Sequence, residues 1–231
     1  WIGLICGLIA MTNISSAVLL FSTCLVVLFI GRVPLKFIAM LLIIGGFSGM
    51  IAFQFGQRGG TAVSRVEVFF GDEIPYQAQQ GYAAMATGGL FGKGPGQSDQ
   101  RNFLPSAYSD FIYAIIIEEY GFVGGIIVIF LYLGLLYRGM KATAHSETAY
   151  GGLLVSGLVF SIIFQAMINI GVTLGLGPIT GVTLPLLSMG GTSQLFFGIA
   201  IGMILSVTQG ELSAFPIGVK GNQLKNLERV A

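Results

Sequence analysis

Charged residues are scarce in this chain. Lys, Arg, Asp and Glu make up 9% of its 231 residues, against about 25% in soluble globular domains. Hydrophobic residues make up 54%, and the 11 basic residues nearly balance the 10 acidic ones. This balance argues against a nucleic-acid partner. The composition therefore excludes an ordinary soluble domain and predicts an all-α polytopic membrane protein.

Cysteine and histidine are also rare, with two cysteines and one histidine. Cys6 and Cys24 lie in apolar runs, so we interpret them as small buried hydrophobic residues rather than a disulfide. His145 lies in a polar stretch and is expected to be solvated. The sequence shows no pattern typical of a metal-ligand cluster, a Ser/His/Asp set or a cysteine nucleophile.

The chain lacks an initiator Met and the basic start and cleavage site of a signal peptide. Residues 1–11 are apolar but too short to span a bilayer, and we interpret them as the end of a helix. We therefore expect residues 1–231 to be a single membrane domain within a longer protein.

Apolar runs of about 20 residues predict about five transmembrane helices. The predicted spans are 14–30, 35–54, 120–137, 149–173 and 193–208. A large polar loop (55–108) follows the second span, and a short polar loop (138–148) follows the third. Residues 175–192 are uncharged and rich in Gly and Pro. Irregular backbone at membrane depth must be buried in protein or line a wet cavity, so these residues predict a re-entrant loop.

Basic residues predict the orientation of the spans. Alternating spans bring three sets to one side: Arg32 and Lys36; Arg138, Lys141 and His145; Lys220, Lys225 and Arg229. The positive-inside rule makes this side, with the C-terminus, the cytoplasm. The 55–108 loop is then extracytoplasmic. Its own basic residues count little, because long loops contribute weakly to the rule.

The 55–108 loop is expected to have some structure of its own. IPYQAQQGYAAMA (74–86) predicts a short helix that lies on the membrane and ends at Gly88-Gly89. GLFGKGPG follows, where glycines allow close approach of backbone to a ligand and Lys93 can meet a phosphate. A flexible turn with a solvated lysine is the alternative.

Asp110, Glu118 and Glu119 are candidate functional carboxylates, because charge gathered within a membrane protein is a functional hypothesis by default. An unbroken helix from Ser106, a candidate cap, to Tyr137 would be about 50 Å long. The hydrocarbon core is about 30 Å thick, so this helix must stand above the core, tilt or bend. The alternatives are an acid that suits the helix dipole at Asp110, and an ion pair or interface anchor at the glutamates.

Gln165 and Asn169 lie four residues apart in the fourth span and share one face of the helix. We interpret them as residues that hydrogen-bond between helices. A transporter would instead use such mid-membrane polar groups for its substrate.

Three runs carry a resemblance to a known family: GYAAMATGGLFGKGPG, NFLPSAYSDFIYAIIIEEYGFVGG and GVTLPLLSMGGTS. Together they resemble the SEDS family (shape, elongation, division and sporulation), over nearly the whole chain. The family has about ten spans, so the chain resembles its C-terminal half, and TNISSA leans towards the FtsW branch. Ser106 and Pro95 depart from the family pattern and leave local detail open.

The resemblance implies a peptidoglycan glycosyltransferase of the bacterial cytoplasmic membrane, which polymerises lipid II with inversion. The residue at the Asp110 position is the family's catalytic carboxylate. One base suffices there, because the leaving group is a lipid pyrophosphate that needs no general acid. Glycosidases need two carboxylates. Lys93, Arg101 or a divalent cation (Mg²⁺ or Mn²⁺) could offset the pyrophosphate charge.

The expected substrate-binding residues are Lys93, Arg101, Gln77, Gln80, Glu118, Glu119, Ser188, Gly190 and Gly191. The resemblance implies as partners lipid II, the nascent glycan-lipid, a class B penicillin-binding protein and other membrane proteins of division or elongation. Two alternatives stay open: a lipid II flippase and a non-catalytic scaffold of the same machinery.

Overall fold

The computed structural model describes residues 1–214, except 56–58, 72–73, 105–106 and 147. Within these residues every regular element is helical, which confirms the all-α class. The elements in chain order are α1 (Ile2–Thr12), α2 (Ile14–Ile30), α3 (Leu35–Phe55), α4 (Gly59–Phe70), α5 (Tyr76–Gly88), the 3-10 helix η1 (Gln100–Asn102), α6 (Ile112–His145), α7 (Ala149–Thr173) and α8 (Gly191–Ala214).

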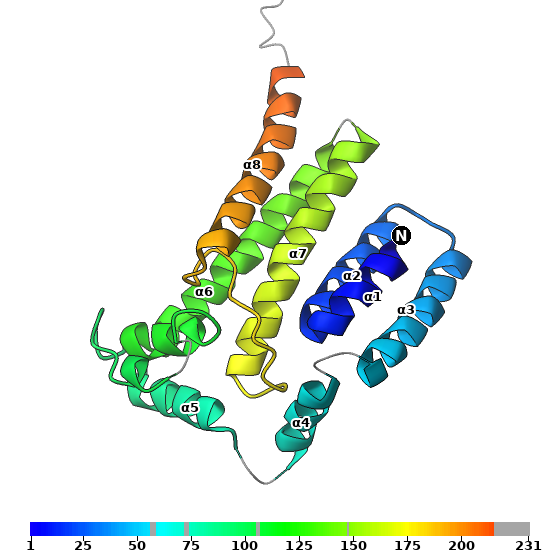
Figure 1. Cartoon of the computed structure of the whole chain (residues 1–231). Coiled ribbons are helices and arrows are strands. Elements are labelled where there is room, and N and C mark those ends of the chain that lie inside the picture. Colours follow the sequence, from blue (N-terminus) through cyan, green and yellow to red (C-terminus); the bar gives the residue numbers. More distant parts are fainter. Residues whose placement is uncertain (56–58, 72–73, 105–106, 147, 215–231) are drawn as a thin grey trace, which may run out of the picture.

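The long helices form two adjoining groups (Figure 1). α6, α7 and α8 lie side by side in one group, and α1, α2 and α3 form the other. α7 packs against α6, α8 and α2, so it joins the two groups. α5 runs crosswise at one end of α6 and α7 and packs chiefly against α6. The irregular residues 174–190, here called the 174–190 segment, connect α7 to α8 at this same end.

Three of the described helices are long and apolar enough to cross a membrane: α6, α7 and residues 191–208 of α8. α1, α2 and residues 35–50 of α3 are shorter apolar helices. All five predicted spans coincide with helices. Large apolar side chains such as Phe47, Phe130 and Phe196 are exposed on them, as side chains that face lipid are. The chain is therefore a multi-pass membrane protein.

The loops predicted on either side of α6 differ from the structure. α6 continues to His145, so most of the predicted 138–148 loop is helix. The remaining connection is short, and the Thr148 hydroxyl caps α7 by accepting the N–H of Gly151 (3.1 Å). His145 is exposed, as expected. The prediction took Arg138 and Lys141 as the start of the loop, but charged side chains at a helix end can extend into water from helical backbone.

The 55–108 interval is more ordered than the sequence suggested. The helix predicted at 74–86 is confirmed as α5, and Gly89 with a φ of +56° follows its end. α4 was not predicted, because the β-branched residues Val63, Val66 and Val68 lower the helix propensity of this stretch.

α6 is broken at Gly121, which has a φ of 74° and a ψ of −176°. Of the three alternatives for a long helix here, a bend is therefore present, and it occurs at the residue type that adopts positive φ without steric cost. The break leaves carbonyls of the preceding turn without partners in their own helix. The N–H groups of Lys93 and Gly94 donate to the carbonyls of Glu118 (3.0 Å) and Glu119 (2.9 Å).

The Gly-rich loop after α5 fits against this break because it lacks side chains. A Cβ at Gly92 would lie 2.2 Å from the carbonyl oxygen of Glu119, and one at Gly121 would lie 2.2 Å from that of Leu90. In return, the N–H of Phe122 donates to the carbonyl of Gly89 (2.9 Å). Gly92 and Gly121 therefore let the backbone of the loop pack against the backbone of α6. Close approach of this loop to a ligand stays a prediction.

We predict that Gly121→Ala and Gly92→Ala each lower the melting temperature of the full-length protein in detergent. A Cβ at positive φ costs about 1–2 kcal/mol, and the clash with a carbonyl adds to this. The matched control is Gly134→Ala, also in α6, where an added Cβ meets nothing within 4 Å. Equal melting temperatures for the Gly121 and Gly134 variants would contradict this packing.

Candidate active site

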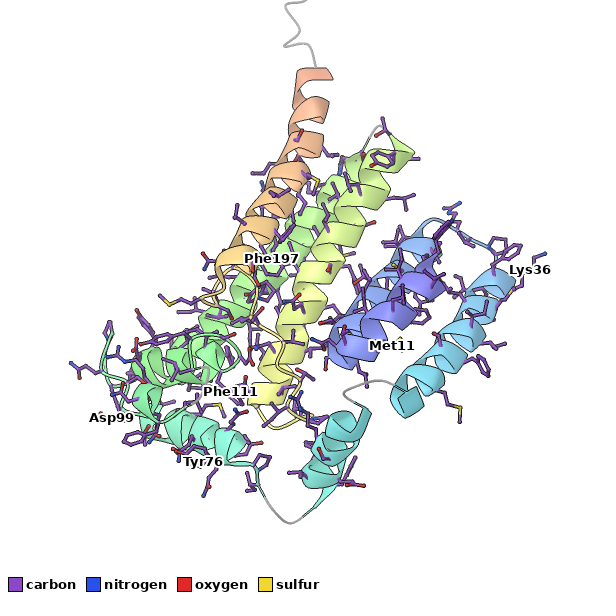
Figure 2. All side chains as sticks on the ribbon, in the orientation of Figure 1. Met11, Lys36, Tyr76, Asp99, Phe111 and Phe197 are labelled. Atoms are coloured by element: carbon purple, nitrogen blue, oxygen red, sulfur yellow. The ribbon has the colours of Figure 1, made fainter. Side chains whose placement is uncertain are left out.

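Asp110 lies two residues before α6, in a turn whose neighbours are buried. Phe111 is 3% exposed and packs in a small core with Leu104, Ala107 and Ile115. Figure 2 shows Phe111 near the junction of α5, α6 and the end of α7. The expectation that Asp110 sits inside a helix starting at Ser106 is wrong, because α6 begins at Ile112. The candidate cap Ser106 lies outside the described residues.

The Asp110 side chain is half-buried and has an asymmetric environment. The hydroxyl of Ser109 donates to Oδ1 (2.8 Å). Oδ2 lies 3.6 Å from the point where a Cβ on Gly181 would stand, and Gly181 has a φ of +69°. Within the described residues, Oδ2 accepts no hydrogen bond. One carboxylate oxygen is thus held, and the other is available to accept a proton.

Three consecutive backbone carbonyls hold the Asp110 turn in place. The carbonyl of Tyr108 accepts from the N–H of Met189 (2.8 Å). The carbonyl of Ser109 accepts from the hydroxyl of Ser188 (2.6 Å). The carbonyl of Asp110 itself accepts from the side-chain amide of Asn169 (2.7 Å). We call these three bonds the carbonyl clamp.

The 174–190 segment is irregular and hydrogen-bonded, but only part of it is buried, since Leu176 and Met189 are exposed. The burial expected of a re-entrant loop is thus confirmed in part. Leu184 is 1% exposed, and its N–H donates to the Ser188 hydroxyl (2.7 Å). The hydroxyl of Tyr132 donates to the carbonyl of Pro185. From α7, Gln165 donates to the carbonyl of Thr183 (3.0 Å). The carbonyls of Thr183 and Pro185 are therefore satisfied by side chains of the surrounding helices, and the N–H of Leu184 is satisfied within the segment.

Asn169 donates a second bond, to the carbonyl of Val182 (2.7 Å). The prediction that Gln165 and Asn169 bond between helices is therefore wrong in its acceptors. These amides bond the 174–190 segment and the Asp110 turn instead. No local sequence signal identifies those acceptors, because they are backbone carbonyls distant along the chain.

Glu118 and Lys93 form a second cluster, at the break in α6. Glu118 is fully buried, and the Lys93 ammonium lies 2.8 Å from its Oε1. The hydroxyl of Ser98 donates to Oε2, and the N–H of Asp99 donates to Oε1 (3.2 Å). Lys93 also pairs with the carboxylate of Asp99 (2.9 Å). The ion-pair alternative is thus confirmed for Glu118, and a substrate-binding role for this cluster stays a prediction.

Hydrogen bonds from its ammonium to Glu118, and next to Asp99, raise the pKa of Lys93 above its usual value. A raised pKa in the folded state means that the pair stabilises the protein fully below the pKa of an unfolded lysine, about 10.4. This stabilisation is lost as the pH rises through the folded-state pKa. The pair is therefore intact across the whole neutral range.

A cleft of about 520 Å³ lies between α4, α5 and the start of the 174–190 segment. Gln77, a predicted substrate-binding residue, lines it together with Arg65, Tyr82 and Ile179. Arg65 donates to the carbonyl of Ile179 (3.1 Å). Sequence analysis missed Arg65, because its partner lies on a segment distant in the chain. The cleft and Asp110 both adjoin residues 179–181, because Ile179 lines the cleft and Gly181 lies beside the Asp110 carboxylate.

The other predicted residues have less specific surroundings. Gln80 and Arg101 are half-buried on α5 and η1. Glu119 contributes its carbonyl to the loop contact, and Gly190 donates its N–H to the carbonyl of Ser188 (2.9 Å). Gly191 is exposed at the start of α8. Substrate binding by these residues stays a prediction.

The described residues contain no group of three or more His, Cys, Asp or Glu side chains that could hold a metal ion. Asp110 offers a single carboxylate. Such a carboxylate fits Mg²⁺ or Mn²⁺ held mainly by substrate phosphates and water, which is how Mg²⁺ commonly binds. A divalent cation that arrives with its substrate stays a prediction.

We predict that Lys93→Met lowers the melting temperature of the full-length protein at pH 7.5, because it leaves the buried Glu118 without its cation. Adding Glu118→Gln should restore part of the loss. The difference between wild type and Lys93→Met should persist to about pH 10 and shrink above it. Lys141→Met, which removes an exposed lysine, is the control. A difference that already vanishes near pH 7 would argue against this ion pair.

Known proteins resemble this chain over most of its length. A family model described as cell cycle protein, of FtsW, RodA and SpoVE, matches residues 1–212. Stage V sporulation protein E of Bacillus subtilis (strain 168) is 36% identical over 205 residues, which cover 85% of this chain and 55% of that protein. A probable peptidoglycan glycosyltransferase FtsW of Coxiella burnetii is 36% identical over 216 residues, covering 89% and 57%.

The peptidoglycan glycosyltransferase RodA of Treponema pallidum is 38% identical over 155 residues, covering 64% of this chain and 36% of that protein. A solved structure has a similar fold, with a TM-score of 0.64 and 24% identity over 87% of this chain and 56% of that one. It comes from work on polymerisation and crosslinking by a peptidoglycan synthase complex. The chain spans about half the length of these relatives. With a family model that matches residues 1–212, the chain belongs to the FtsW/RodA/SpoVE family, the SEDS family whose motifs its sequence resembles.

Proposed function

We propose that the protein is a peptidoglycan glycosyltransferase that polymerises lipid II, with Asp110 as its general base. Relatives over much of this chain carry the name peptidoglycan glycosyltransferase, which supports the reaction class. The observation that carries the residue assignment is the environment of Asp110. Its backbone is fixed by the carbonyl clamp, while its Oδ2 has no donor among the described residues.

This environment suits removal of a proton from a sugar hydroxyl. Oδ2 accepts the proton as the hydroxyl oxygen bonds to the anomeric carbon of the donor. The bond from that carbon to the lipid pyrophosphate breaks on the opposite face, so the configuration inverts. The leaving group departs as an anion and needs no proton, so one carboxylate is enough. The Ser109 hydroxyl keeps Oδ1 hydrogen-bonded and orients the carboxylate.

The substrates in this proposal are lipid II and the nascent glycan-lipid, and a class B penicillin-binding protein is the partner. The cleft near Asp110, of about 520 Å³, has room for part of such a substrate, and Gln77 and Arg65 add polar groups to its mainly apolar lining. Lys93 is already paired with two carboxylates, which favours a supporting role over direct contact with pyrophosphate.

We place Asp110 on the extracytoplasmic side of the bacterial cytoplasmic membrane, with the C-terminus in the cytoplasm. Figure 1 supports this orientation. The connections from α2 to α3 and from α6 to α7, which adjoin basic residues, lie at one end of the bundle. α5 and the 174–190 segment, which lie beside Asp110, occupy the other end. The positive-inside rule assigns the basic end to the cytoplasm.

The flippase alternative required available polar groups inside the membrane, at Gln165 and Asn169. Both amide nitrogens instead donate to backbone carbonyls of the 174–190 segment. These contacts occupy the amide nitrogens that a flippase would need for its substrate, and so they favour an enzyme. The polymerisation assay of the Asp110 variant distinguishes an enzyme from a non-catalytic scaffold.

We predict that Asp110→Asn abolishes glycan polymerisation by the full-length protein with its transpeptidase partner. The isosteric amide cannot accept the proton, and a general base contributes about 10²–10⁴-fold in rate. Polymerisation is measured from purified lipid II, alongside binding of lipid II. Binding should survive the substitution.

Glu67→Gln is the matched control, because Glu67 is an exposed carboxylate on α4 that belongs neither to the Lys93–Glu118 cluster nor to the lining of the cleft. It should polymerise at close to the wild-type rate. Full activity of Asp110→Asn would reject the proposed base and favour the transporter or scaffold.

A further inference from the structure

Asn169 is a buried amide that connects α7 to the Asp110 turn and to the 174–190 segment. It lies on α7 and is 2% exposed. Its Nδ2 donates to the carbonyl of Asp110 and to that of Val182, each at 2.7 Å. One side chain therefore bridges the turn that carries the carboxylate and the 174–190 segment that packs over it.

The chemistry of this position requires an amide. A single nitrogen with two N–H groups can serve two carbonyls at once. A carboxylate of the same shape would face both carbonyls with acceptors only, and an apolar residue would leave both unpaired. The two bonds also fix which end of the amide is nitrogen, so Oδ1 is the acceptor, and it has no partner in the described residues. A buried acceptor without a partner is costly and needs an explanation.

Ser188 makes the neighbouring connection in the same way. Ser188 is 3% exposed, and its hydroxyl donates to the carbonyl of Ser109 and accepts the N–H of Leu184. Asn169 and Ser188 thus hold adjacent peptide groups, one on each side of the Asp110 Cα. Together they restrict the rotations that aim the carboxylate.

We propose that Asn169 and Ser188 are positioning residues, which act through Asp110 by fixing the direction of its carboxylate. This inference rests on the proposed function. Ser188 was expected to bind substrate, and its buried, doubly bonded hydroxyl assigns it this role instead. Small displacements of a catalytic group reduce the rate of the chemical step much more than they reduce substrate binding.

The test measures kcat and KM for lipid II polymerisation by the full-length protein with its transpeptidase partner. We expect Asn169→Ala and Asn169→Asp to lower kcat by about 10-fold or more, with KM within about twofold. Ser188→Ala should do the same, and Ser188→Thr, which keeps the hydroxyl, should recover most of the rate.

Gln165→Ala is the matched control, because Gln165 lies one turn earlier on α7 and bonds the same segment without contacting Asp110. We expect it to lower the melting temperature as Asn169→Ala does, but to keep kcat within about twofold of wild type. If an Asn169 variant fails to fold, the Ser188 pair decides the question.

Asp110→Asn, assayed in parallel, separates the two claims. If it is inactive while the Asn169 and Ser188 variants keep the wild-type kcat, the positioning role is wrong and the proposed function stands. If it is fully active, the proposed function itself is wrong. A loss of kcat in Gln165→Ala equal to that in Asn169→Ala would show a merely structural effect and overturn the inference.

Discussion

Backbone polar groups away from water need partners, and this constraint shapes the part of the chain around Asp110. The turn before α6 and the 174–190 segment are both irregular, so neither satisfies its carbonyls within a helix. Ser188 and Met189 of the segment, together with Asn169 of α7, donate to the carbonyls of the turn. Asn169 and Gln165 of α7 and Tyr132 of α6 donate to carbonyls of the segment. The resulting clamp makes two segments distant in sequence into one unit, which holds a half-buried carboxylate beside a cleft.

The same constraint acts at the break in α6. Positive φ at Gly121 interrupts the helix, and the loop after α5 supplies N–H groups to the carbonyls of Glu118 and Glu119. The buried Glu118 carboxylate then gathers Lys93, Ser98 and Asp99 around the loop. This second cluster fixes α5 on α6, and α5 forms one wall of the cleft.

The sequence predicted those elements whose limits depend on local signals. α7 follows an apolar run that begins after the capping residue Thr148, and its predicted bounds of 149–173 are those of the structure. The start of α6 was predicted too early, because distant bonds hold residues 108–110 out of helical geometry. α4 was missed because its β-branched residues oppose its helical structure. Motifs identified Asp110, and the polar spacing on α7 identified Asn169, but nothing in the sequence indicated the acceptors of Asn169, which lie 59 and 13 residues away.

Hydrogen exchange of the 174–190 segment in the full-length protein, reconstituted in lipid nanodiscs, tests the central claim most directly. In the clamp, the N–H of Met189 donates to the carbonyl of Tyr108, and the N–H of Leu184 donates to the hydroxyl of Ser188, which is itself a member of the clamp. We predict that these amides exchange as slowly as those of α7, although they lie outside any helix. Exchange as fast as that of an exposed loop would contradict the account.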